Sequence, residues 1–409
     1  MSAARRAAGL TKYLTRLGHR VTVLSSVMCG SGPVPGAACT VKTRDLLVSP
    51  LNWRRSGFAA LKGEAAQAYP GGPSALAAWV IPDLELIGWL PFALPRALAL
   101  AASGRFHCVI TSSPPQSAHL IGLALQRAGL PWVADLRDGW SFEPSGERFP
   151  SGRRRQLDRA LEQVVLARAD ALVAVTPPIA EDLRERLNPA AVTITNGYDP
   201  DELAGADAAS AQAPVSAERF TVAYTGTLAY GGASAASLLD GFRALRGREP
   251  AIAARLEFVF AGPMAGEDLT QLRAPDLDGH VRVVGAMSRE QALGLQRAAD
   301  ALVLIVDGRR PSIATGKLYE YLSSGRPILV IGEGSVAARI VEECSAGVVV
   351  GADAPEAIAE ALRRLLRGGA AVPTPARGAA ERFSYAQIAV EMADVVERAI
   401  ARRSLRTAR

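Results

Sequence analysis

Cysteine and histidine are scarce in this chain, with four of each among 409 residues. The cysteines are scattered and form no C-x-x-C pair, so the sequence contains no recognisable zinc site. Scattered single cysteines are also typical of a reducing compartment, and we expect a cytoplasmic protein. The four positions are Cys29, Cys39, Cys108 and Cys344.

Long uninterrupted apolar runs are missing as well. A transmembrane helix needs about 20 consecutive apolar residues. The most apolar stretch, 77–100, is interrupted by three charged residues and three prolines, namely Asp83, Glu85, Arg96, Pro82, Pro91 and Pro95. Residues 1–6 lead directly into a polar helical pattern, without the apolar segment of a signal peptide. The sequence therefore predicts neither a membrane span nor a secretion signal.

Long runs of like charge are missing too. The net charge is +6, and the longest run of basic residues is the three arginines at 153–155. This run lacks the interleaved aromatic residues that bind single-stranded nucleic acid. We expect no nucleic-acid partner, only a mild attraction to phosphates or acidic lipids.

No G-x-G-x-x-G follows an apolar strand, which argues against a dinucleotide-dependent enzyme. Asp276 and Asp278 have the spacing of a metal-binding DxD, but they precede a strand, where a polar turn is expected.

Short apolar runs alternate with amphipathic helical patterns along the chain. Such alternation predicts parallel sheets covered by helices on both faces, and hence an α/β protein with two Rossmann-like domains. Ligands of such folds bind in the cleft at the carboxyl ends of the strands. The strands are expected at 21–24, 109–111, 132–134, 171–175, 192–194, 220–224, 257–261, 281–284, 301–306, 327–331 and 347–350, and the helices at 5–17, 116–128, 151–169, 178–187, 234–246, 289–297, 316–323, 335–343, 354–366 and 385–403.

The domain boundaries follow from composition. Residues 203–216 are rich in Ala, Ser and Pro and predict a linker between an N-terminal domain, 1–202, and a C-terminal domain, 217–384. A last helix and basic tail occupy 385–409. The first recognisable element is a helix, so the first strand of the N-terminal sheet is missing. Our hypothesis is that Met1 is an internal or misassigned start.

The most informative segment is 315–328, TGKLYEYLSSGRPI. Gly316 opens a helix after a strand and a loop, and the free N–H groups and dipole of such an end favour a phosphate. Lys317 adds a cation, and Glu320, one turn further on, offers a carboxylate to the two hydroxyls of a ribose. The alternative is that Lys317 and Glu320 form an ordinary i,i+3 pair on the helix surface.

The segment resembles the nucleotide-sugar signature of glycosyltransferase family 4, a family of retaining enzymes with the two-domain GT-B fold. Three further segments resemble family motifs in the same order: 18–24, 194–199 and 223–228. The resemblance therefore covers nearly the whole chain. It implies that Glu320 holds the donor ribose, and that Thr315, Gly316 and Lys317 contact the diphosphate or the transferred sugar. It also implies a phosphate loop at Gly226 and Thr227, and a nucleobase contact at Gly285.

The chain departs from the family pattern at two donor positions. Ser312 stands where the family often has a second glutamate, and Thr227 stands where an arginine is common. Arg309 and Arg310, just before the donor loop, are candidates to replace that charge, because guanidinium binds phosphate through two parallel hydrogen bonds. The alternative is that both arginines belong to a solvated turn.

The acceptor side is expected at strand ends of the N-terminal domain. Asp135, Arg137 and Asp138 follow an apolar strand, and charges there rarely serve a core. Asp138 is the best candidate to contact the acceptor or the sugar, since many relatives have a histidine in place of Arg137. Ser113 and His119 form a second edge of this site; the alternative for His119 is a hydrogen-bonded histidine that caps a helix.

The resemblance implies a retaining glycosyltransferase of the hexosyltransferase class, with Asp138, Lys317 and Glu320 as its catalytic residues. The donor is a nucleotide diphosphate sugar, and the acceptor a cell-envelope or exopolysaccharide glycan or a lipid-linked precursor. No cofactor and no metal are expected. The aromatic segment 79–101 is expected either to rest on the inner face of the plasma membrane or to cap a core. The alternative functions are a non-catalytic GT-B binding protein and a sugar-nucleotide epimerase. Base, sugar and oligomeric state are not indicated.

Overall fold

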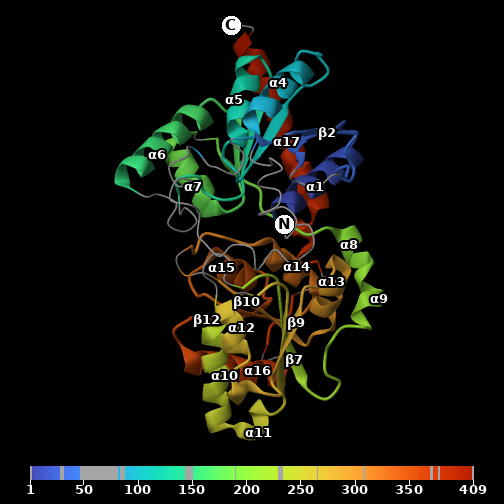
Figure 1. Ribbon diagram of the computed structural model, residues 1–409, viewed down its shortest axis with the longest axis vertical. Helices are drawn as coiled ribbons and strands as arrows, with labels where there is room; N and C mark the ends of the chain where they lie inside the picture. Colours follow the sequence, from blue (N-terminus) through green and yellow to red (C-terminus); the bar gives the residue numbers. More distant parts are fainter. Residues whose placement is uncertain are drawn as a thin grey trace. The chain divides into compact units, whose positions relative to one another are not determined.

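The computed structural model describes residues 2–27, 32–46, 82, 88–142, 151–188, 190–228, 234–264, 266–306, 308, 310–368, 372–375 and 378–407. The chain divides into two compact units (Figure 1). Unit 1 comprises Met1–Asn196 and Tyr385–Arg409, and unit 2 comprises Gly197–Ser384.

The described strands of unit 1 form two parallel sheets. β1 (Thr22–Ser26) pairs with β2 (Cys39–Thr43), and β3 (Val109–Ser113), β4 (Trp132–Leu136), β5 (Ala171–Ala174) and β6 (Val192–Thr193) follow one another in the second sheet. All the pairings are parallel, as the alternating pattern predicts. The helices of the unit are α1 (Ser2–Arg16), α4 (Leu90–Ala101), α5 (Ala118–Arg127), α6 (Gly152–Leu166), α7 (Pro177–Arg186) and α17 (Tyr385–Thr407).

The core of unit 1 is centred on β4, where all five residues are buried. Gly122 of α5 lies directly against Trp132, because a Cβ at this glycine would come within 2.2 Å of the indole ring. A second core cluster forms where α17 packs its buried Ile388 and Met392 against α1 and the sheet. The last helix of the sequence therefore returns to the N-terminal unit.

Unit 2 contains one six-stranded parallel sheet in the order β12-β11-β10-β7-β8-β9. Its strands are β7 (Phe220–Thr225), β8 (Leu256–Ala261), β9 (Val281–Gly285), β10 (Ala301–Ile305), β11 (Ile328–Ile331) and β12 (Gly347–Val350). The chain leaves β7 toward β8 and β9 and then returns to build β10, β11 and β12 on the other side. The boundary between β7 and β10 is thus the topological switch point, where parallel α/β sheets bind their ligands.

Helices cover both faces of this sheet. α10 (Ala236–Arg248), α12 (Gly266–Leu272) and α16 (Pro355–Arg367) supply residues to one core cluster, and α13 (Arg289–Ala298), α14 (Gly316–Ser324) and α15 (Val336–Glu343) supply residues to the other. The remaining short helices are α8 (Pro200–Ala204), α9 (Ala206–Ser210), α11 (Pro250–Ala253), and the 3-10 turns η6 (Pro275–Leu277) and η8 (Glu381–Phe383).

The structure places the boundary between the units at 196/197, earlier in the chain than the expected linker at 203–216. Half of that segment is helical, because the end of α8 and the whole of α9 fall within it, and both helices belong to unit 2. α9 packs against α13 so closely that a Cβ at Gly294 would lie 2.6 Å from the backbone of Ala209. The small alanines that suggest a linker in the sequence are what permit this contact, since Ala favours helix and takes little space.

The aromatic segment before α4 is only partly described. Trp89 is buried among Ala93, Ile121 and other apolar residues, and its indole N–H donates to the Thr43 hydroxyl at 2.6 Å. Of the two environments expected for this segment, Trp89 thus adopts the core position; Trp79 lies outside the described residues. Within the described part of the chain, no helix combines the length and the apolarity that crossing a membrane requires.

Candidate active site

The amino end of α14 lies at the switch point of the unit 2 sheet. The helix begins at Gly316, with Thr315 as its N-cap, and the Thr315 side chain forms no capping hydrogen bond. Thr315 is exposed, and Gly316 and Lys317 are half-buried. A helix end of this kind presents N–H donors and the positive end of the helix dipole to an anion.

Lys317 reaches from this helix to the loop that follows β7. Its Nζ donates to the Tyr224 hydroxyl at 2.7 Å and lies 4.1 Å from the centre of the Tyr224 ring. The same hydroxyl donates to the carbonyl of Thr227 at 3.0 Å. Burial lowers the pKa of Lys317 to about 8, although the charge of Glu320 acts in the opposite direction. The ammonium form therefore prevails at neutral pH.

Glycines bring the carboxyl ends of three strands together. The Gly226 N–H donates to the carbonyl of Ala261 at 2.8 Å, and the Gly262 N–H donates to the carbonyl of Gly285 at 2.7 Å. Gly262 has a φ of +129°, and a Cβ there would lie 2.3 Å from the Gly226 carbonyl. A Cβ at Gly226 itself would lie 3.0 Å from the Lys317 ammonium. The loop after β7 is thus in direct contact with the cation of α14.

Glu320 is 4% exposed and lies one turn into α14. Its Oε2 pairs with Nη1 of Arg289 at 2.8 Å and accepts from Nε2 of Gln296 at 3.4 Å. Gln296 also donates to the Thr225 hydroxyl at 2.8 Å, and so joins the carboxylate to the residue just before Gly226. Glu320 is therefore part of a buried network rather than a member of a pair on the helix surface.

The loop between β10 and α14 holds the remaining donor-side candidates. Arg310 is half-buried, and Ser312, where a family glutamate is often found, is 3% exposed. The Val336 N–H donates to the carbonyl of Pro311 at 2.8 Å, which ties this loop to α15. Arg309 lies outside the described residues.

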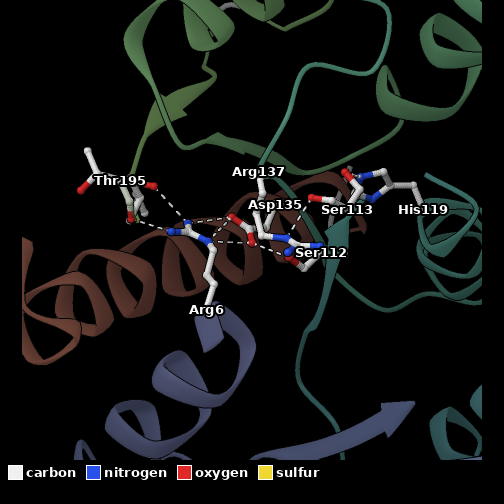
Figure 2. Close-up of polar contacts among 8 residues, drawn as sticks. Arg6, Ser112, Ser113, His119, Asp135, Arg137 and Thr195 are labelled. Carbon is white, nitrogen blue, oxygen red and sulfur yellow. Dashed lines mark hydrogen bonds and ion pairs between the residues drawn. The ribbon is translucent and has the colours of Figure 1, made fainter. Parts of the chain in front are cut away.

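On the acceptor side, Asp135 is fully buried and is held by Arg6 of α1 (Figure 2). The Arg6 guanidinium donates to both carboxylate oxygens at 2.7–3.1 Å and to the carbonyl of Ile194 at 3.0 Å. The Ser112 hydroxyl donates to the same carboxylate at 2.8 Å. Burial alone would raise the pKa of Asp135, but the charge and the hydrogen bonds of Arg6 outweigh it and lower the pKa.

His119 occupies the core next to this ion pair. Its ring is fully buried, with Nδ1 2.8 Å from the Thr111 hydroxyl and Nε2 2.8 Å from the Ser113 hydroxyl, and it stacks on Trp140. Burial lowers the pKa of His119 to about 4, so the ring is neutral at pH 7. Sequence reasoning placed Asp135, Ser113 and His119 at an acceptor surface. The structure buries all three, because each polar atom finds a partner inside the fold.

Arg137 and Asp138 remain at the edge of this core, and both are half-buried. Nε of Arg137 donates to the carbonyl of Ser113 at 3.1 Å, and Nη2 donates to the carbonyl of Pro114. Burial lowers the pKa of Arg137, and the negative charge of Asp138 acts in the opposite direction. Of the five acceptor-side residues, Asp138 is therefore the carboxylate best placed to meet a ligand.

Two family models match this chain. One is described as a Glycosyl transferase 4-like domain and matches residues 3–198; the other is described as Glycosyl transferases group 1 and matches residues 219–368. The chain belongs to the group 1 glycosyltransferases. No curated protein sequence matches this glycosyltransferase at a significant level.

Solved structures resemble the glycosyltransferase over most of its length. Sucrose-phosphate synthase from Thermosynechococcus elongatus is 19% identical, with a TM-score of 0.65 over 96% of this chain and 92% of that chain. WaaG, a glycosyltransferase involved in lipopolysaccharide biosynthesis, is 14% identical, with a TM-score of 0.54 over 97% and 94%. TarM from S. aureus is 10% identical, with a TM-score of 0.52 over 75% and 59%. These likenesses confirm the predicted GT-B fold with two parallel-sheet domains.

Three residues of the glycosyltransferase that touch the candidate donor site were missed by sequence reasoning. Tyr224 receives the Lys317 hydrogen bond, and Arg289 and Gln296 both reach Glu320. Arg289 and Gln296 are seven residues apart on α13, a spacing that places two side chains on one face of a helix. That spacing is the only sequence signal for the pair, and it does not reveal which carboxylate the face meets.

Proposed function

We propose that this glycosyltransferase binds a nucleoside diphosphate sugar on unit 2 and transfers the sugar with retention of configuration at the anomeric carbon. The observation that carries the proposal is the convergence, at the β7–β10 switch point, of the amino end of α14, the Lys317 ammonium and the buried Glu320 carboxylate. A cation beside free helix N–H groups suits a diphosphate, and a carboxylate one turn away suits the hydroxyls of a ribose.

The proposed roles follow from the chemistry of each group. Lys317 and the first turn of α14 stabilise the negative charge that develops on the diphosphate as its bond to the anomeric carbon breaks. Arg310, from the loop before α14, adds a second cation for the phosphates. Stabilisation by these groups is the reason to expect a reaction that proceeds without a metal ion. Gly285 at the end of β9 borders the nucleobase.

A bound nucleoside diphosphate is also supported by a relative of the same fold. The TarM structure is a complex with fondaparinux, α-GlcNAc-glycerol and UDP. A sequence identity of 10% supports a shared fold only. The base that the present glycosyltransferase binds is identified by the titration of four diphosphates described below. The argument for a diphosphate is the Lys317 ammonium, and the argument for a ribose is the Glu320 carboxylate.

The acceptor side of the proposal is a cell-envelope or exopolysaccharide glycan or a lipid-linked precursor, bound through Asp138 of unit 1. The acceptor hydroxyl forms the new bond to the anomeric carbon, and its proton leaves with the nucleoside diphosphate product. WaaG, which has the same fold, is involved in lipopolysaccharide biosynthesis. We further propose a cytoplasmic protein that associates peripherally with the inner face of the plasma membrane.

The first test is a calorimetric titration of UDP, GDP, ADP and dTDP into the protein. One diphosphate is expected to bind, and Glu320→Gln is expected to weaken it by about 1–3 kcal/mol, the cost of losing a hydrogen bond to a charged group. Glu343→Gln serves as the matched control, because this exposed glutamate lies on α15 and pairs only at the surface with Arg382. Absence of binding to all four diphosphates would contradict the proposed donor site.

The transfer itself is tested with the matching nucleotide sugar and a membrane extract as the source of acceptor. A mass increase of one sugar on a lipid-linked or polysaccharide product, dependent on donor and lost in Lys317→Met, is the expected outcome. Conversion of the free nucleotide sugar into its epimer, with no labelled product, would refute a transferase and identify an epimerase.

A further inference from the structure

We propose that Arg289 is a positioning residue of the donor site, which fixes the Glu320 carboxylate in the orientation that receives the ribose hydroxyls. The inference rests on the proposed nucleotide-binding role of Glu320. It adds a residue that acts through Glu320, from a helix outside the motif segment 315–328.

The contacts of α13 converge on one oxygen of Glu320. Nη1 of Arg289 lies 2.8 Å from Oε2, and Nε2 of Gln296 donates to the same atom at 3.4 Å. Two donors on a single oxygen restrict the rotation of the carboxylate about its terminal bond. Binding groups act efficiently only when their own rotamers are held by a supporting layer of contacts.

Arg289 is itself held in place from a second direction. Its Nε donates to Oε2 of Glu202 on α8 at 2.8 Å, and the side chain is 25% exposed. Burial opposes its charge, but Glu320 and Glu202 outweigh that effect and raise the pKa of Arg289. The guanidinium therefore remains charged at every accessible pH, and its planar fork bridges two carboxylates that a lysine could not hold together in the same geometry.

The energetic reason for the pairing is the burial of Glu320. A carboxylate that is 4% exposed needs a partner, because an unpaired buried charge is strongly unfavourable. Without Arg289 the side chain is expected to turn toward other donors or toward water. Ribose recognition then suffers, whereas the phosphate contacts of Lys317, which is held by Tyr224, keep their geometry.

The test compares each binding diphosphate with its 2′,3′-dideoxy form, which lacks the ribose hydroxyls. The ratio of the two dissociation constants measures ribose recognition and is insensitive to a general loss of folded protein. The variants are Arg289→Met, Glu320→Gln and the double variant, with melting temperatures recorded for each. Arg289→Lys keeps a positive charge beside the buried carboxylate, in case Arg289→Met does not fold.

A matched control is available on the same helix. Arg297 of α13 is also half-buried and also contacts the segment after 196/197, through Asp207 at 2.9 Å and the Leu203 carbonyl at 3.0 Å. Arg297→Met should therefore reproduce the general effects of removing an arginine from this helix. It should leave the ribose preference unchanged.

The wild-type protein is expected to prefer the ribose form by about tenfold or more, as for a hydrogen bond to a charged group. Arg289→Met and Glu320→Gln should each abolish most of that preference, and the double variant should lose no more than Glu320→Gln alone. An unchanged preference in Arg289→Met, or equal weakening of both nucleotide forms, would overturn the role of Arg289. If no diphosphate binds to the wild type, the donor site itself is refuted and the inference with it.

Discussion

The Lys317 ammonium lies 2.7 Å from the hydroxyl of Tyr224 and 4.1 Å from the centre of its ring. The tyrosine is the second-to-last residue of strand β7, just before the Gly226 loop, and the lysine belongs to the first turn of α14. The pair therefore links the two elements that flank the switch point of the sheet. Burial of the lysine at this place lowers its pKa to about 8, so its charge changes within a pH range that experiments can reach.

Diphosphate binding should weaken as the pH rises through about 8. The pKa of Lys317 is lowered to about 8 by burial, so the ammonium is present below that pH and is lost above it. Because an anion binds the charged form, the affinity should fall by up to about tenfold per pH unit above pH 8. Calorimetric titrations between pH 6.5 and 9.5 measure this, and Lys317→Arg should flatten the profile. A flat profile in the wild type would contradict a phosphate contact by Lys317.

Replacing Tyr224 by Phe should move that profile to lower pH. The hydroxyl accepts a hydrogen bond from the ammonium and so favours its charged form. Without the hydroxyl, only the charge of Glu320 opposes the effect of burial on the lysine. Diphosphate affinity at pH 7.5 should drop by about 1 kcal/mol, the usual worth of one hydrogen bond. The neighbouring Tyr321→Phe is a poor control because Tyr321 holds the Thr225 backbone. Phe260→Leu, which removes the ring packed against Tyr224, tests whether packing alone explains the change.

The ion pair between Arg6 and Asp135 should be essential for the stability of unit 1. Arg6 is 1% exposed and Asp135 is fully buried, so loss of one partner leaves a buried charge without its counter-ion. We expect Arg6→Met to lower the free energy of unfolding by about 3–5 kcal/mol. All five tryptophans lie in unit 1, so tryptophan fluorescence in urea follows this unit alone.

The control for that experiment is the neighbouring residue on the same helix. Arg5 is exposed, and Arg5→Met should change the stability of unit 1 by no more than about 0.5 kcal/mol. Similar losses in both variants would mean that the charge of α1, and not the buried pair, is responsible.

His119 should destabilise unit 1 as the pH falls from about 6.5 to about 4. Its pKa is lowered by burial from 6.5 to about 4, so in this window the unfolded chain takes up a proton that the folded protein refuses. Stability is therefore complete above pH 6.5 and declines by about 3 kcal/mol toward pH 4. His119→Gln, which cannot titrate, should show a smaller decline in tryptophan-detected melting temperature over this range. Parallel curves for the two proteins would show that other groups cause the acid sensitivity.

Sequence reasoning was most successful where neighbours in the chain decide the outcome. The alternation of strands and helices, the start of α14 at Gly316 and the spacing of Lys317 and Glu320 on one turn depend on local periodicity, and the structure has them as predicted. Composition is a weaker guide, because small residues suit both a flexible chain and a tightly packed helix. Residues 203–216, rich in Ala, Ser and Pro, predict a linker, and the structure forms α9 from part of this segment and packs it against α13.

The sequence by itself therefore determined the fold class, the family and the residues at the amino end of α14, because these depend on patterns a few residues long. The tertiary structure alone decided that Asp135 is held by Arg6, 129 residues away, that His119 lies in the core, and that Glu320 meets Arg289 of another helix. A charged residue at the end of a strand looks the same in the sequence whether it faces a ligand or a buried partner. The difference arises only when distant segments pack together and either exclude water from the charge or leave it open to a ligand.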